Sequence, residues 1–202
     1  MSQFMANPTE EHIKKALHIV KYVKSTMNAK LVYNGKGMEG LLAYTDADWA
    51  ECKDTRKSVT GYLIKLAGAP VSWTTRKQKT IALSSTESEY MALSDTTKQV
   101  TWIKSLFGEL GFILTGIEVY VDNQGAIFIA QADVTETRSK HIDIKHHHVR
   151  EKIKDGTVKL LHVPTNEQQA DILTKSLTHV KFRELRDKIG VQVSQRGSVL
   201  KL

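Results

Sequence analysis

The order of its β-rich and helical segments constrains this chain more than any other feature. Between residues 40 and 75, three β-rich runs follow one another with only polar or Gly/Pro turns between them. From residue 84 onward, helical patterns separate two further β-rich runs, at 117–123 and 158–163. Strands joined by short turns pair antiparallel, whereas strands joined through helices pair parallel. The sequence therefore predicts a mixed α/β fold in which the later strands lie parallel to a central one.

The leading segment reads as a separate helix. It begins at "NPTEEH", with Asn7 as the N-cap and Pro8 at the first helical position, and it ends near residues 27–28. The glycines of "GKG" at residues 35–37 then predict a boundary.

The composition excludes several classes of protein. The chain has 202 residues, enough for one well-buried domain with an appendage. It has one cysteine, which excludes an internal disulfide framework and suits a reducing compartment. It has no secretory signal pattern, and no run approaches the roughly 18 apolar residues of a membrane span. The formal charge of +7 favours a polyanionic partner, although a merely basic, soluble surface explains it as well.

Two glutamates near the start of the helix at 84–110 occupy different faces. Helical spacing from Glu89 leads along an apolar stripe through Leu93, Val100 and Ile103, whereas spacing from Glu87 leads to a polar face. A capping box, either Thr86 with Glu89 or Ser84 with Glu87, is the rival explanation. Such a box does not require a glutamate in line with the apolar stripe.

The positions of the other acids are consistent either with a chemical role or with an ordinary structural one. Asp122 closes the strand of "YVDNQ" but could instead cap the next helix. Asp46 and Asp48 share one strand face, and either could be a turn acid. Asp171 lies in "QQADIL", within a helix predicted over "TNEQQADILTKSL", where periodicity alone favours a surface position. Four clustered carboxylates are consistent with shared Mg²⁺ or Mn²⁺, because buried acids repel one another without a counter-charge. Two such ions could activate a water and stabilise the leaving oxygen of a phosphodiester.

Five ordered motifs carry a family resemblance: "YTDADWAECKDTRKSVTGYL", "SWTTRKQKTIALSSTESEYMAL", "YVDNQGAI", "KHIDIKHHHVRE" and "VPTNEQQADILTKSL". With "KFRELRDKIGV", they resemble the ribonuclease H domain of the Pol polyprotein of copia-like LTR retrotransposons. The resemblance covers about residues 38–191. Residues 1–37 resemble the connection from reverse transcriptase, and residues 192–202 are expected to be a tail.

The resemblance implies a ribonuclease H-like fold, a five-stranded mixed sheet with an antiparallel meander, two parallel strands and flanking helices. It implies cleavage of the RNA strand of RNA/DNA hybrids with two Mg²⁺, or Mn²⁺, during reverse transcription. The expected partners are the hybrid, reverse transcriptase and other Pol-derived domains, without a membrane. The expected location is intracellular, in a cytoplasmic virus-like particle or the nucleus. The catalytic and metal-binding acids implied are Asp46, in preference to Asp48, with Glu89, Asp122 and Asp171.

The histidines do not extend this site. Cellular ribonucleases H carry a glycine-rich loop with a histidine before the last aspartate, whereas here the only histidine of "HVPTNEQQAD", His162, falls at a predicted strand end. His146, His147 and His148 cannot all face one metal from a helix, because neighbouring side chains point about 100° apart. A solvated or packed helix face is the better interpretation.

Basic and polar residues near these motifs are candidates for contacts with nucleic acid. Those singled out are Arg76, Lys77, Lys79, Asn123, Gln124, Arg138 and Lys140. A solvated surface explains any single one of them equally well. Two alternatives to a ribonuclease H remain: an inactive nucleic-acid-binding or scaffolding remnant of a retroelement, and a nuclease of the same fold that acts on DNA.

Overall fold

A computed structural model describes residues 4–33, 40–52, 54–132 and 140–193, without the side chains of 140–146. The chain divides into two compact units. The larger is Tyr33–Gly190, and the smaller combines Met1–Val32 with Val191–Leu202.

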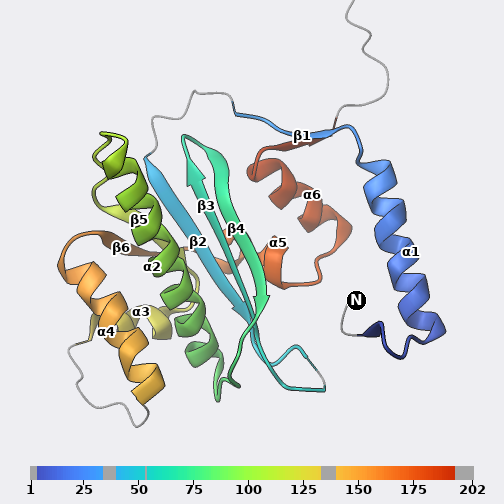
Figure 1. The fold of residues 1–202 in the computed structure, drawn as a ribbon, viewed down its shortest axis with the longest axis horizontal. Helices are drawn as coiled ribbons and strands as arrows, with labels where there is room; N and C mark the ends of the chain where they lie inside the picture. The colour runs from blue at the N-terminus through green and yellow to red at the C-terminus, as the bar shows by residue number, and fades with distance from the viewer. Residues whose placement is uncertain (1–3, 34–39, 53, 133–139, 194–202) are drawn as a thin grey trace, which may run out of the picture. The chain divides into compact units, whose positions relative to one another are not determined.

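The larger unit is built on a five-stranded mixed sheet (Figure 1). Its strands are β2 (Leu41–Asp48), β3 (Val59–Leu66), β4 (Ala69–Lys77), β5 (Ile117–Val121) and β6 (Val158–His162). They lie in the order β4-β3-β2-β5-β6, with antiparallel pairs from β4 to β2 and parallel pairs from β2 to β6. The predicted antiparallel meander with two parallel strands is confirmed.

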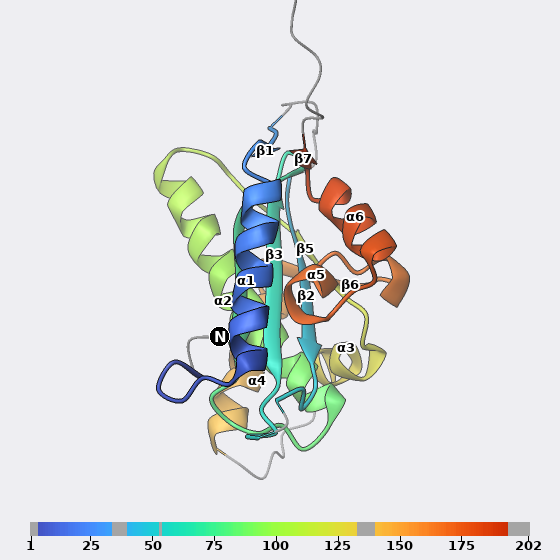
Figure 2. The same cartoon turned by 90° about the vertical axis from the view of Figure 1, so that its right-hand side faces the viewer.

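Helices cover both faces of this sheet. They are α2 (Ser85–Glu109), α3 (Gln124–Gln131), α4 (Lys140–Lys154), α5 (Asp171–Thr174) and α6 (His179–Lys188). With the sheet seen nearly edge-on in Figure 2, α2 and α4 lie on one side and α5 and α6 on the other. The helix predicted from residue 84 to 110 is confirmed as α2, capped by Ser84 and Leu110.

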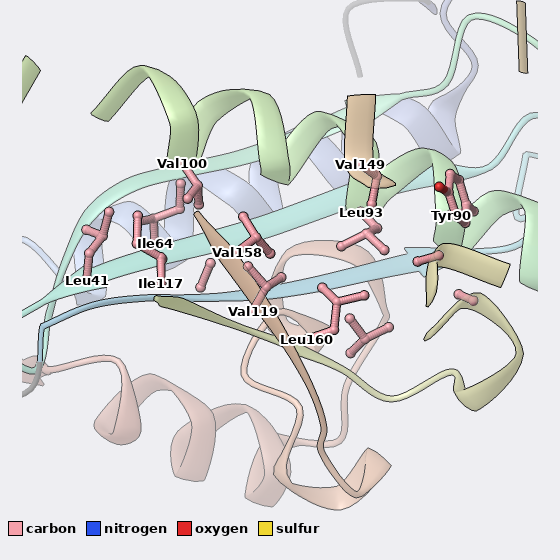
Figure 3. Packing of buried hydrophobic residues seen from close by; sticks show 14 of the residues in the cluster. Leu41, Ile64, Tyr90, Leu93, Val100, Ile117, Val119, Val149, Val158 and Leu160 are labelled. Carbon is pink, nitrogen blue, oxygen red and sulfur yellow. The ribbon is translucent and has the colours of Figure 1, made fainter. Parts of the chain in front are cut away.

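The main core lies between α2 and the sheet. Leu93 and Val100 point from α2 toward Ile64, Ile117 and Val119, as Figure 3 shows, and all five are almost fully buried. Burying each such side chain contributes about 1.5–3 kcal/mol. Because this packing fixes the rotation of α2 about its axis, it also fixes the direction of every other side chain on the same stripe.

The helix expected over "TNEQQADILTKSL" is much shorter than predicted. The structure has a 3₁₀ turn, η2 (Thr165–Glu167), and then the single turn α5. Between them Gln168 is fully buried, and its side chain donates to the Thr45 carbonyl at 2.9 Å and accepts from the Ala170 amide at 3.2 Å. The tertiary contact with Thr45 and the local bond to Ala170 replace the helical hydrogen bonds that the local pattern favours.

The smaller unit contains α1 (Glu10–Ser25) and a two-stranded sheet of β1 (Ala29–Leu31) and β7 (Val191–Val193). The N-cap expected at Asn7 is wrong by two residues. Thr9 caps α1, because its side chain and that of His12 exchange hydrogen bonds with each other's backbone amides. The β1–β7 pair joins chain segments about 160 residues apart, a contact that local patterns cannot predict.

Candidate active site

Three aspartates converge where parallel strands end. Asp46 lies near the carboxyl end of β2, Asp122 directly follows the neighbouring β5, and Asp171 begins α5. One carboxylate oxygen from each lies within 4.8 Å of those from the other two. Within the part of the chain that the structure describes, they are the one group of three possible metal ligands. Asp171, for which periodicity alone favours the surface, is 5% exposed.

Glu89 is buried beside them, at 6% exposure, on the stripe that also carries Leu93. The two capping alternatives are now resolved. Ser84 accepts a hydrogen bond from the Glu87 amide at 3.1 Å, and the Glu87 carboxylate accepts one from the Leu83 amide at 2.7 Å. Ser84 therefore caps the helix, with Glu87 bonded to the preceding amide, and capping does not explain why Glu89 faces the core.

The structure also excludes the alternative that Asp122 caps α3. The N-cap of α3 is Asn123, whose Oδ1 accepts a hydrogen bond from the Ala126 amide at 2.9 Å. The carboxylate of Asp122 is left to face the other acids.

The acids strongly perturb one another. Burial, followed by the negative charges of Asp46 and Asp122, raises the pKa of Glu89 to about 9. Burial and then Asp46 raise the pKa of Asp122. Burial also raises the pKa of Asp171, against the lowering effect of its hydrogen bond from Lys175. Such a cluster favours any positive charge that can enter it.

The chain itself supplies one such charge, which the sequence-based interpretation missed. The ammonium of Lys175 lies 3.0 Å from Asp46 Oδ1 and 2.7 Å from Asp171 Oδ1. Burial lowers the pKa of Lys175, but the two carboxylates outweigh this effect and raise it overall. The spacing of Asp171 and Lys175, four residues apart, was a visible signal for the second contact.

The resemblance favours Asp46 over Asp48, although strand alternation predicts that both lie on one face. Asp48 lies two residues beyond Asp46 on the same strand face and is partly buried. Burial first, and then the charge of Asp46, raise its pKa. Asp48 is thus electrostatically part of the same cluster, at its more exposed side.

The residues fit a divalent cation. Two carboxylate oxygens, Glu89 Oε2 and Asp122 Oδ1, are buried without a hydrogen-bond partner among the described residues. A buried carboxylate oxygen without a donor is costly unless a cation satisfies it. Carboxylate oxygens are also the ligands that Mg²⁺ and Mn²⁺ prefer.

The candidate nucleic-acid contacts on β4 and beyond lie on several surfaces. Arg76 pairs with Asp95 at 2.5 Å, and Lys77 donates to Cys52 Sγ at 3.1 Å. Lys79 and Gln124 are exposed, whereas the Asn123 side chain caps α3. Arg138 and the side chain of Lys140 lie outside the described residues.

A groove of about 870 Å³ runs beside Arg76 and Lys79. Its other lining residues include the aromatic Tyr62 and Trp102 and the basic Lys98. Aromatic and cationic side chains together suit the bases and phosphates of a nucleic-acid strand.

The histidines remain apart from the acids. His162 is exposed at the end of β6, as the sequence predicts. His148 is partly buried in α4, and burial lowers its pKa. The side chain of His146 lies outside the described residues.

Comparison with known proteins relates the chain to transposons. No protein-family model matches it. It is 41% identical over 192 residues to the retrovirus-related Pol polyprotein from transposon RE1 of Arabidopsis thaliana, and 39% identical over 191 residues to that from transposon TNT 1-94 of Nicotiana tabacum. Each match covers 95% of this chain, which spans 13% and 14% of the length of these relatives.

Comparison of structures identifies the fold. The structure of LC11-RNase H1, isolated from compost, matches with a TM-score of 0.52 and 16% identity, over 68% of this chain and 94% of that one. The fold is therefore of the ribonuclease H type, as the sequence predicts. None of the helices in the described parts of the chain is both long and apolar enough to cross a lipid bilayer.

Proposed function

Because 95% of the chain matches retrotransposon Pol polyproteins and its fold is of the ribonuclease H type, we propose that it is the ribonuclease H domain of a copia-like Pol polyprotein, an endonuclease that hydrolyses the RNA strand of RNA/DNA hybrids. The observation that carries the proposal is the convergence of Asp46, Asp122 and Asp171, with Glu89 buried beside them. This acid cluster lies at the carboxyl ends of parallel strands, where open α/β sheets bind their ligands.

In this proposal Asp46, Glu89, Asp122 and Asp171 hold two Mg²⁺ or Mn²⁺ ions. When bound, such ions supply an activated water and charge stabilisation for the leaving oxygen of the phosphodiester. The protein contributes a rigid arrangement of ligands. Asp46 and Asp122 are held by adjacent strands, and Glu89 by a helix packed on the core, so these three ligands themselves need to move little on metal binding.

The hybrid would be held by residues outside the acid cluster. Arg76, Lys77 and Lys79 would contact phosphates from the end of β4, and Asn123 and Gln124 would contact the strand near Asp122. Arg138 and Lys140, whose side chains lie outside the described residues, are proposed as further phosphate contacts. Phosphate contacts orient the duplex without reading its sequence, which suits an enzyme that degrades hybrids of any sequence.

The proposed setting is a Pol polyprotein. Residues 38–191 would form the ribonuclease H domain, and residues 1–37 would connect it to reverse transcriptase, with 192–202 as a tail. An intracellular site of reverse transcription, in a virus-like particle or the nucleus, follows from this setting.

Cleavage of a labelled RNA/DNA hybrid in Mg²⁺ tests the proposal, with DNA duplex and RNA duplex as controls. We expect the wild-type chain to cut the RNA strand of the hybrid and neither control. Asp122→Asn should abolish cleavage, since it removes one ligand charge while keeping the side-chain shape. Its metal-free form should be at least as stable as wild type, because one repulsive charge is gone.

Three results would count against the proposal. Cleavage of the DNA duplex would favour a DNA-acting nuclease of this fold. Binding of the hybrid without cleavage in Mg²⁺ or Mn²⁺ would favour an inactive binding module. Metal-dependent cleavage by Asp122→Asn would exclude this active site, because it would show that the Asp122 carboxylate is not needed. The substitution does not touch the cap of α3, which is Asn123.

A further inference from the structure

The acid cluster already contains a positive charge. Lys175 Nζ lies 3.0 Å from Asp46 Oδ1 and 2.7 Å from Asp171 Oδ1, and both carboxylates are buried. These two aspartates belong to the group whose oxygens lie within 4.8 Å of one another. The ammonium therefore bonds to oxygens that a divalent cation would need.

The fold directs Lys175 to this position. The single turn α5 ends at Thr174, and Lys175 leaves it with extended backbone angles while its amide donates to the Asp171 carbonyl at 2.9 Å. The Thr174 hydroxyl donates to the second oxygen of Asp46. Asp46 is thus held by two neighbouring residues of one short segment, one neutral donor and one cation.

The approach of this segment depends on Gly61, which pairs with Asp46 across β2 and β3. A Cβ atom at Gly61 would lie 2.5 Å from Thr174 Cγ2 and 3.1 Å from Leu173 Cβ. Only a residue without a side chain leaves room for α5 to pack this closely on the sheet.

An ammonium and a metal ion compete for the same carboxylate oxygens. Lysine has three donors and no acceptor, so it cannot ligate a metal and can only repel one nearby. In the metal-free protein the same ammonium is needed, because buried carboxylates without a counter-charge are strongly destabilising.

We propose that Lys175 is a built-in counter-ion of the acid cluster, which stabilises the metal-free fold and must withdraw from Asp46 when a divalent cation binds. This inference rests on the proposed function, because it assumes that the acids bind metal. The side chain of Lys175 is 31% exposed, so it lies at the edge of the cluster and has a path to solvent. Lys175 is in this sense a positioning residue, which sets metal affinity through the ligands it holds.

Mn²⁺ binding measured by calorimetry, together with thermal melts in chelator, tests the inference without any activity assay. We expect Lys175→Gln to bind Mn²⁺ about tenfold more tightly than wild type, because a competing positive charge is gone. In chelator the variant should melt at a lower temperature, and saturating Mn²⁺ should raise its melting temperature by more than it raises that of wild type. Lys175→Arg keeps the charge and should bind Mn²⁺ like wild type.

Lys188→Gln is the matched control. Its ammonium pairs with Glu184 at 3.0 Å on the exposed face of α6, so Mn²⁺ affinity should be unchanged. Equal or weaker Mn²⁺ affinity of Lys175→Gln would overturn the inference while leaving the metal site intact. A Lys175→Gln chain that stays unfolded at saturating Mn²⁺ would also overturn it, because the metal should replace the missing charge. If neither wild type nor Lys175→Gln binds Mn²⁺, the metal site of the proposed function fails instead.

Discussion

Glu89 combines two properties that seldom occur in one residue. It lies on the buried stripe of α2 with Leu93 and Val100, and one of its carboxylate oxygens has no hydrogen-bond partner among the described residues. Periodicity alone predicted its burial, because the stripe extends over several helical turns. Periodicity placed Asp48 on the strand face of Asp46, but it could not predict Lys175, whose proximity to the acids depends on how the segment around α5 packs.

Glu89→Gln should change how stability depends on pH in the metal-free protein. The pKa of Glu89 is about 9 in the folded chain and near 4.5 in the unfolded chain. Between these values the folded state retains a proton that the unfolded state has lost, so wild-type stability falls as pH rises through this window. Gln cannot ionise and keeps the shape. We therefore expect the variant to be more stable than wild type by about 1–3 kcal/mol at pH 7, with no gain below pH about 4.5.

Thermal or urea unfolding in chelator from pH 4 to 9 measures this difference. The control is Glu87→Gln, since glutamine also serves at that capping position and the carboxylate lies outside the core. Its stability should follow wild type across the range. A difference between Glu89→Gln and wild type that stays constant with pH would contradict the expected titration.

At the scale of elements, predictability follows the source of each element's stability. Each of β2, β3 and α2 has its own hydrophobic periodicity over eight or more residues, so local patterns were enough to predict these elements. The segment around α5 takes its shape from the contact of Gln168 with β2 and from Lys175 reaching Asp46. A local pattern there predicted a longer helix because those partners are more than 100 residues away in sequence. The candidate acids were named through family resemblance, and their convergence follows from strand order.

Gly61→Ala should displace α5 from the sheet. The added methyl would overlap Thr174, and overpacking of this kind costs about 1–3 kcal/mol. Since Asp171 begins α5, the displacement should also weaken Mn²⁺ binding, measured by calorimetry. Gly108→Ala is the control: it lies in α2 with open space around it, so alanine should leave Mn²⁺ affinity unchanged and stability equal or slightly higher. Unchanged Mn²⁺ affinity in Gly61→Ala would show that Asp171 does not depend on this close contact.

At the scale of the whole molecule, all four acids and Lys175 belong to the unit Tyr33–Gly190. The break predicted at residues 35–37 falls within a stretch outside the described residues, a few positions from the boundary between the units. The pairing of β1 with β7 had no counterpart in the sequence-based interpretation, which treated residues beyond 191 as a tail. Two strands of three residues have too few hydrogen bonds and too little buried surface to predict their pairing from pattern.

A fragment spanning residues 33–190 should therefore fold and bind Mn²⁺ by itself. It keeps the five-stranded sheet, its core and the hydrogen bond from Tyr33 to the Pro70 carbonyl at 2.6 Å. It loses α1, which has no buried residue, and the β1–β7 pair. We expect one cooperative thermal transition, with a melting temperature within about 4 °C of that of the whole chain, as a loss near 1 kcal/mol implies. Mn²⁺ affinity should match that of the whole chain, because every ligand and Lys175 are retained.

Loss of the cooperative transition would show that Ile13, Leu17 and Val20 of the leading helix contribute to the main core. A folded fragment with weakened Mn²⁺ binding would show instead that the smaller unit helps to shape the acid cluster.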